Sequence, residues 1–150
     1  MILIGATCFS VVLRGLGGDD VIQEMFLAFG TDSRVVVLFM LVIVFLLGFL
    51  LDWIEISLIL LPLALPIVTQ LGIDPVWFTV LVAMTLQTSM ITPPVGFSLF
   101  YVRSIVPDTV STTAIYRGIV PFVAIQIFCV ALIFLVPTIV TYLPKVVYGY

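Results

Sequence analysis

The sequence contains no histidine, and only 9% of its 150 residues are charged. The absence of histidine excludes catalysis by a histidine general base and most zinc sites. Five basic residues stand against eight acidic ones, with no basic cluster, so no nucleic-acid partner is expected. The two cysteines, Cys8 and Cys129, lie far apart in apolar runs, as small hydrophobic side chains do. We therefore expect no enzymatic activity.

Apolar residues are what the sequence has in excess, because they make up 63% of the chain. An ordinary soluble domain is about 45–50% apolar and about 25% charged. Long uncharged runs carry most of this excess: Val35–Leu51, Ile56–Ile73, Pro75–Val102 and Gly118–Pro144. Since a membrane span needs ~20 apolar residues, the sequence predicts an all-α integral membrane protein in a lipid bilayer.

Residues 1–34 are predicted to precede the first informative element. Met1–Leu13 is apolar but short, and no basic residue precedes it, so it suits neither a signal peptide nor a complete span. We interpret it as the end of a scaffold helix that begins upstream. Asp20–Phe29 has apolar residues on one side at helical spacing, which predicts an amphipathic helix along the membrane surface.

Residues 35–72 are predicted to form a hairpin. A single helix over Val35–Ile67 would measure roughly 50 Å, whereas the hydrocarbon core is ~30 Å thick. The acidic residues Asp52 and Glu55 mark the interruption. Two alternatives remain open: a re-entrant hairpin whose tip stops inside the bilayer, or two ordinary spans joined at the interface. An ionised carboxylate at the bilayer centre costs at least ~2.5–3.5 kcal/mol, so Asp52 at that depth would require a cation.

Residues 73–105 are predicted to form a broken transmembrane helix, because Pro75–Val102 is too long for one straight crossing. The break falls at Thr92-Pro-Pro-Val-Gly96. Two successive prolines remove two hydrogen-bond donors and would release the carbonyls of Ser89 and Met90. Gly96 then allows a sharp turn.

A stripe of hydroxyl side chains leads into this break and occupies one helical face: Thr85, Thr88, Ser89 and Thr92. Neutral oxygens beside unwound backbone suit a small alkali cation. The alternative is that these hydroxyls bond back to helical carbonyls or hold neighbouring helices together.

Residues 106–150 are predicted to form a loop and the last span. Arg103 and Arg117 flank a polar stretch, which favours a cytoplasmic loop. The span over Gly118–Pro144 would then bring the C-terminus to the opposite side. Trp77 and Phe78, at the start of the preceding helix, are expected at the membrane interface.

Several motifs resemble those of a known family. They are Gly48-Phe-Leu-Leu-Asp-Trp-Ile-Glu, Leu71-Gly-Ile-Asp-Pro-Val-Trp-Phe, Leu86-Gln-Thr-Ser, Thr92-Pro-Pro-Val-Gly-Phe and Ile115-Tyr-Arg-Gly-Ile-Val-Pro-Phe. Together they resemble the large membrane subunit of tripartite ATP-independent periplasmic (TRAP) transporters over essentially the whole chain. The chain looks closest to the branch labelled mannitol/chloroaromatic compound transporters.

The resemblance implies a sodium-driven symporter of the elevator type in the bacterial inner membrane, with several spans per chain. Its fold would be the second inverted-repeat half, with a re-entrant helical hairpin, a broken transmembrane helix and a final scaffold helix. The implied partners are a small four-helix membrane subunit and a periplasmic substrate-binding protein. The implied substrate is an organic acid anion.

The resemblance also assigns site residues by motif. The Na⁺ site would use Gly48, Asp52, Thr88, Thr92, Val95 and Gly96, of which Val95 and Gly96 offer main-chain carbonyls. The residues assigned to substrate are Glu55, Ser89 and Thr85. Because only the second repeat is present, we expect the missing N-terminal half to be a further partner and expect no transport by this chain alone. The rival hypothesis is a non-transporting structural module or vestigial fragment that only assembles with other membrane subunits.

Overall fold

The regular structure of the described residues is entirely helical, which confirms the predicted all-α class for them. The computed structural model describes residues 2–18, 21, 24, 32–93, 96–107 and 109–149. The predicted surface helix over residues 20–29 falls almost entirely outside these. The helices are α1 (Ile2–Gly15), α3 (Ser33–Leu47), α4 (Trp53–Gln70), α5 (Pro75–Ile91), α6 (Phe97–Ile105), α7 (Thr112–Leu135) and α8 (Thr138–Tyr148).

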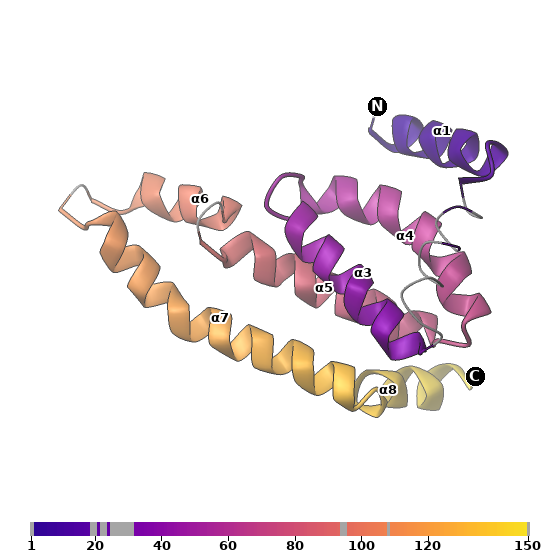
Figure 1. Ribbon diagram of the computed structural model, residues 1–150. Helices are drawn as coiled ribbons and strands as arrows, with labels where there is room; N and C mark the ends of the chain where they lie inside the picture. The colour runs from indigo at the N-terminus through magenta and orange to yellow at the C-terminus, as the bar shows by residue number, and fades with distance from the viewer. Residues whose placement is uncertain are drawn as a thin grey trace.

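Helices α3 and α4 form a hairpin that turns back between Gly48 and Asp52 (Figure 1). The Asp52 carboxylate begins α4 by accepting a hydrogen bond from the Trp53 backbone N–H at 2.7 Å. At the open end of the hairpin, the Ser33 hydroxyl donates to the carbonyl of Leu71 at 3.3 Å. A cap at the tip and a bond at the open end therefore fix both ends of the hairpin.

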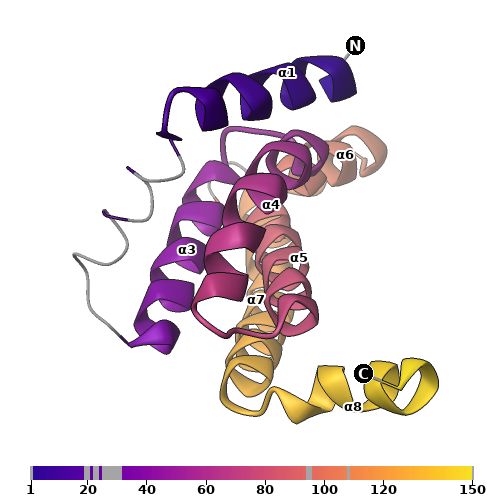
Figure 2. The same ribbon diagram turned by 90° about the vertical axis from the view of Figure 1, so that its right-hand side faces the viewer.

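Helix α5 lies at the centre, and α3, α4 and α7 all pack against it (Figures 1 and 2). Its start is set locally: the Asp74 carboxylate accepts from the backbone N–H groups of Val76 and Trp77 at 2.9 and 3.2 Å, with Pro75 in the first turn. The Asp-Pro pair therefore sets the helix start through neighbouring residues alone. The most deeply buried apolar side chains come from three of these helices: Val36, Val37, Val44, Val68, Phe78, Leu81 and Val82.

Trp77 and Phe78 are buried in this core, and their predicted place at the membrane interface stays a prediction. The reason for the burial of Trp77 lies in α7. Pro137 has no N–H, so the carbonyl of Ile133, four residues earlier, lacks its usual helical donor. The Trp77 indole Nε1–H donates to that carbonyl at 2.8 Å, and its ring packs on Phe134 with 5.8 Å between ring centroids. The tryptophan thus satisfies a polar group of a neighbouring helix.

The loop between α6 and α7 is shorter than predicted, because Arg103 lies within α6 and Arg117 within α7. Helix α7 begins early because the Ser111 hydroxyl accepts from the backbone N–H of Ala114 at 3.3 Å. The Arg103 guanidinium donates to the carbonyl of Val110 at 2.6 Å and so closes the connection. The two arginines therefore do not bound one long polar loop.

The predicted last span is divided into two helices. Helix α7 ends at Leu135, and α8 begins at Thr138 and lies across the end of α7 (Figures 1 and 2). In length and hydropathy α4 and α7 could each cross a membrane, with 18 and 24 residues. Helix α3 has 15 residues, or about 22 Å at ~1.5 Å per residue, which is short of a complete crossing.

Candidate ion site at the hairpin tip and the helix break

The hairpin tip touches α5 one turn before α5 ends. Gly48 is buried and has helical dihedral angles (φ −63°, ψ −12°), so its conformation does not require glycine. A Cβ atom at this position would overlap with the Ser89 hydroxyl oxygen and would lie 2.8 Å from the Ser89 Cβ. Gly48 is therefore needed for space, because the absence of a side chain lets the tip meet α5.

Three hydroxyls near this contact bond back to the helix that carries them. Thr88 donates to the carbonyl of Met84 at 2.7 Å, Ser89 to that of Leu86 at 2.8 Å, and Thr92 to that of Thr88 at 2.6 Å. Since each hydroxyl hydrogen is engaged, the oxygen retains only lone pairs. These oxygens can accept a hydrogen bond or ligate a cation, but they cannot donate to an anion without giving up the helical bond.

The helix is interrupted between α5 and α6. The backbone N–H of Thr92 donates to the Ser89 carbonyl at 3.2 Å, so one of the two carbonyls predicted to be released has a partner. Gly96 begins α6 with φ +27°, a conformation that side chains other than glycine rarely adopt. A Cβ at Gly96 would lie 3.1 Å from the carbonyl oxygen of Met90, so α6 starts close to the end of α5. Val95 lies outside the described residues.

The two acidic residues of the tip both lie at the start of α4. Asp52 is exposed and caps the helix, while Glu55 is half-buried in the first turn. Negative charge at a helix N-terminus is favourable because the backbone N–H groups there are unpaired. The structure thus gives Asp52 a capping role at the tip, and it brings Gly48 and Ser89 into contact.

Thr85 differs from the other hydroxyls of the stripe. It is 6% exposed, and among the described residues its hydroxyl oxygen has no hydrogen-bond partner. Thr85 and Thr88 line a cavity of about 450 Å³ between α3, α5 and α7, whose other lining side chains are apolar. This part of the stripe therefore faces α3 and α7, whereas Ser89 meets the tip.

A more polar cavity of about 600 Å³ lies between α4, α5 and α6. Its polar lining residues were not predicted as site residues: Trp53, Ser57, Thr79, Gln87 and Ser98. On α5 the lining residues Thr79, Ala83 and Gln87 recur every four residues and therefore share one face, a pattern visible in the sequence. Glu55, Ser89 and Thr85, the residues assigned to substrate, are not among the described residues that line it.

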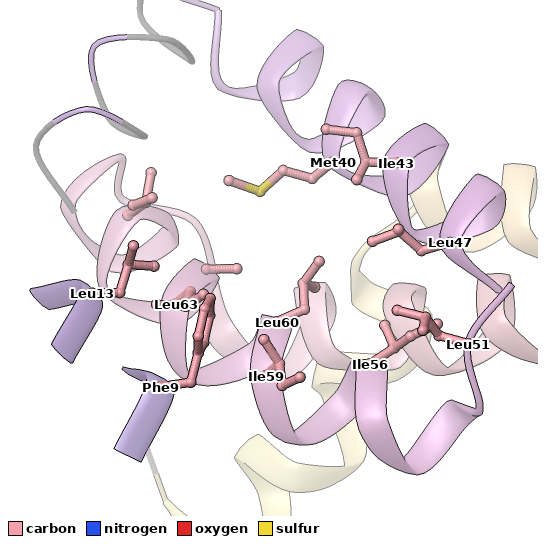
Figure 3. Close-up of a pocket in the computed structure, with 12 residues that line it drawn as sticks. Phe9, Leu13, Met40, Ile43, Leu47, Leu51, Ile56, Ile59, Leu60 and Leu63 are labelled. Carbon is pink, nitrogen blue, oxygen red and sulfur yellow. The ribbon is translucent and has the colours of Figure 1, made fainter. Parts of the chain in front are cut away.

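The cavity between α1, α3 and α4 is of a different kind. It measures about 360 Å³ and is lined only by apolar side chains, including Phe9 and Leu13 of α1 and Met40 of α3 (Figure 3). An ion or a carboxylate would find no polar partner there. In addition, no group of three His, Cys, Asp or Glu residues able to hold a metal occurs in the described part of the chain. Neutral oxygens at the tip and the break are the candidate ligands.

The described structure thus combines two helices long and apolar enough to cross a membrane with a helical hairpin and an interrupted central helix. Residues 1–139 match the family model for the tripartite ATP-independent periplasmic transporter, DctM component. The chain belongs to this membrane-embedded family.

Relatives in this family are permeases, which are transport proteins rather than enzymes. The sialic acid TRAP transporter large permease protein SiaM of Vibrio cholerae is 28% identical over 150 residues, which are 100% of this chain and 35% of SiaM. The sialic acid permease SiaT of Haemophilus influenzae is 27% identical over 97% of this chain and 24% of its own length. The isethionate permease DctMQ of Oleidesulfovibrio alaskensis is 26% identical over 89% of this chain and 21% of its own length. The chain thus spans about a third or less of each.

Proposed function

We propose that the chain is the membrane permease component of a sodium-coupled, binding-protein-dependent TRAP transporter for organic acid anions. In this proposal it is the C-terminal half of the large subunit, an inverted repeat that carries one Na⁺ site. The main support is the contact of Gly48 with Ser89 beside the interruption between α5 and α6. Related permeases named for sialic acid, isethionate and C4-dicarboxylate support an organic acid as cargo.

The proposed Na⁺ ligands are oxygen atoms at the tip and at the break. The hydroxyl oxygens of Thr88 and Thr92 suit a cation, because their hydrogens are engaged with backbone carbonyls. The Asp52 carboxylate would neutralise the ion, and main-chain carbonyls would complete the set at Gly48, Val95 and Gly96. The coupled movement of Na⁺ down its electrochemical gradient would drive uptake.

The hairpin is proposed to be re-entrant. Helix α3, at about 22 Å, is too short to cross a ~30 Å hydrocarbon core unaided. A tip that stops inside the bilayer would put Asp52 where an ionised carboxylate requires a counter-ion. In this proposal, the depth of the hairpin tip in the bilayer is therefore the reason that Asp52 binds a cation.

Substrate recognition is proposed to rest on neutral groups, because Arg34, the arginine of helices α3–α5, is exposed in the first turn of α3, at the open end of the hairpin. The cavity between α4, α5 and α6 offers Ser57, Gln87 and Ser98 for hydrogen bonds. Glu55, Ser89 and Thr85 remain predicted substrate contacts, to be completed by the N-terminal half of the subunit. In this proposal α7 serves as the final scaffold helix of an elevator-type transporter.

The proposed partners are the remainder of the large subunit, a small four-helix membrane subunit and a periplasmic substrate-binding protein. The proposed location is the bacterial inner membrane, with several spans. Within the family, the motifs favour the mannitol/chloroaromatic compound branch.

Sodium-dependent uptake by the complete transporter tests the site. Asp52→Asn and Thr92→Ala should each weaken the dependence of uptake on the Na⁺ concentration. Thr69→Ala is the matched control for Thr92→Ala, because the Thr69 hydroxyl also donates to a carbonyl four residues earlier (Leu65, 3.0 Å). Thr69 lies at the end of α4 that is remote from the hairpin tip. Normal sodium dependence in both site variants would refute the assignment.

The second candidate function is a structural membrane module without a ligand. The observation that favours it is that Thr88, Ser89 and Thr92 all bond back to their own helix, as hydroxyls with a purely structural role do. Such a module would bind no Na⁺, and neither Asp52→Asn nor Thr92→Ala would change anything but stability.

A further inference from the structure

Helix α8 lies almost entirely beyond residue 139, where the match to the family model ends, although the similarity to SiaM extends over the whole chain. It has 11 residues, or about 16 Å at ~1.5 Å per residue, and cannot cross a membrane. It follows α7 after a break at Val136 and Pro137, and it lies across the end of that helix (Figures 1 and 2).

The two faces of α8 differ in chemistry. Ile139, Tyr142, Leu143 and Val146 are 50–70% exposed, and their spacing of three and four residues places them on one side of the helix. On the other side Thr141 is buried, with its hydroxyl donating to a carbonyl of the preceding turn. An apolar face is thus left uncovered by the described part of the chain.

The charged side of α8 is attached to the bundle. The Lys145 ammonium nitrogen lies 3.9 Å from a carboxylate oxygen of Asp74, the residue that caps α5. One carboxylate thereby contacts both the start of the central helix and the last helix. The pair is partly exposed, so it sets orientation more than it adds stability.

The helix that precedes α8 also exposes many apolar side chains. Helix α7 has 24 residues, or about 36 Å, which covers a ~30 Å hydrocarbon core. It exposes apolar side chains that do not line the cavity toward α3 and α5: Val120, Phe122, Ile125, Phe128 and Leu132. If α7 crosses the core, α8 begins where the hydrocarbon ends, and its apolar face points into the boundary between head groups and acyl chains.

We propose that α8 is an in-plane membrane anchor whose apolar face is covered by lipid. Lipid fits this narrow face because it requires no complementary shape, and because tyrosine is favoured at the membrane interface. Lys145 and Asp74 then lie on the aqueous side, and the anchor holds the start of α5 at the membrane surface. This role is independent of Na⁺ binding.

Spin labels on the full chain in phosphatidylcholine vesicles test the proposal. In a Cys8→Ser, Cys129→Ala background, single cysteines replace Leu143 or Val146 on the apolar face. Thr109, exposed in the loop between α6 and α7, supplies the aqueous control. Power saturation compares collisions of each label with oxygen, which concentrates in lipid, and with a water-soluble nickel chelate.

Labels at Leu143 and Val146 should collide several-fold more with oxygen, relative to the nickel chelate, than the label at Thr109. Asp74→Asn should increase the mobility of both labels while leaving them in lipid. Nickel accessibility equal to that of the control would place the face in water and overturn the proposal. Protection from both reagents would mean that protein covers it, which overturns the proposal as well. Two positions are used so that one misfolded variant does not decide the outcome.

Discussion

The contact between Gly48 and Ser89 gives the sharpest stability prediction. Because Gly48 has helical dihedral angles, alanine would be acceptable to the backbone, so any penalty must come from the space around the new methyl group. That methyl would lie 2.8 Å from the Ser89 Cβ, whereas carbon atoms in good contact are about 3.5–4.0 Å apart. The tip and α5 must therefore move apart by roughly 1 Å, or Ser89 must change its rotamer.

Either response destabilises the fold. Overpacking of this kind costs typically about 1–3 kcal/mol. Rotation of Ser89 would also break its 2.8 Å bond to the Leu86 carbonyl, which contributes about 0.5–1.5 kcal/mol. Gly48→Ala should therefore lower the free energy of unfolding by about 1–3 kcal/mol, whichever response occurs. Since 1 kcal/mol moves the Tm of a domain of this size by about 2–4 °C, thermal unfolding in detergent should show a fall of at least ~2 °C.

Gly118→Ala is the matched control, because a Cβ at Gly118 in α7 meets nothing within 4 Å. It should be neutral or stabilise by roughly 0.5–1 kcal/mol, the usual helical advantage of alanine. Combining Gly48→Ala with Ser89→Gly should restore most of the lost Tm, since both overlapping atoms are then removed. An unchanged or higher Tm for Gly48→Ala alone would refute the close approach of tip and helix.

Two further predictions concern single side chains, and a third concerns transport by the chain alone. Trp77→Phe leaves the Ile133 carbonyl unpaired and should cost about 1–3 kcal/mol in a thermal or denaturant melt, and Pro137→Ala should recover part of this by restoring an N–H donor. If the single variant Trp77→Phe unfolds like the wild type, the hydrogen bond from Trp77 to the Ile133 carbonyl does not stabilise the fold. Thr85→Val removes a buried hydroxyl that has no hydrogen-bond partner among the described residues. Because burying such a group costs about 1–3 kcal/mol, the variant should have a higher Tm. A lower Tm would contradict the burial of the Thr85 hydroxyl without a partner. In liposomes the chain alone should show no sodium-dependent uptake of organic acids, and measurable uptake would overturn the view that it needs its other half.

Helix starts could be predicted from the sequence because they depend on neighbouring residues. Asp74 and Pro75 begin α5 by accepting hydrogen bonds and by presetting the backbone, and both effects act within one turn. The burial of Trp77 could not be predicted in the same way, because its hydrogen-bond acceptor is 56 residues away. Pro137 in the last apolar run was a local signal for the division into α7 and α8, and it also explains why that acceptor is available.

For the candidate site, too, positions on one helix could be predicted and contacts between helices could not. Helical spacing correctly puts Thr85, Thr88 and Ser89 close together on α5, but spacing alone does not specify which neighbour each one faces. Thr85 and Thr88 line the cavity toward α3 and α7, while Ser89 meets the tip. The polar cavity was missed because its hydrogen-bonding groups come from three helices, and spacing within one helix does not show that the fold brings the three together.

Binding of radioactive Na⁺ to the purified chain in vesicles tests the central claim most directly, since it requires neither partners nor transport. The account predicts saturable binding that unlabelled Na⁺ displaces and K⁺ does not, with the signal reduced at least tenfold by Thr92→Ala and retained in Thr69→Ala. Absence of saturable binding, equal displacement by K⁺, or equal loss in both threonine variants would contradict a sodium site at the hairpin tip and the helix break.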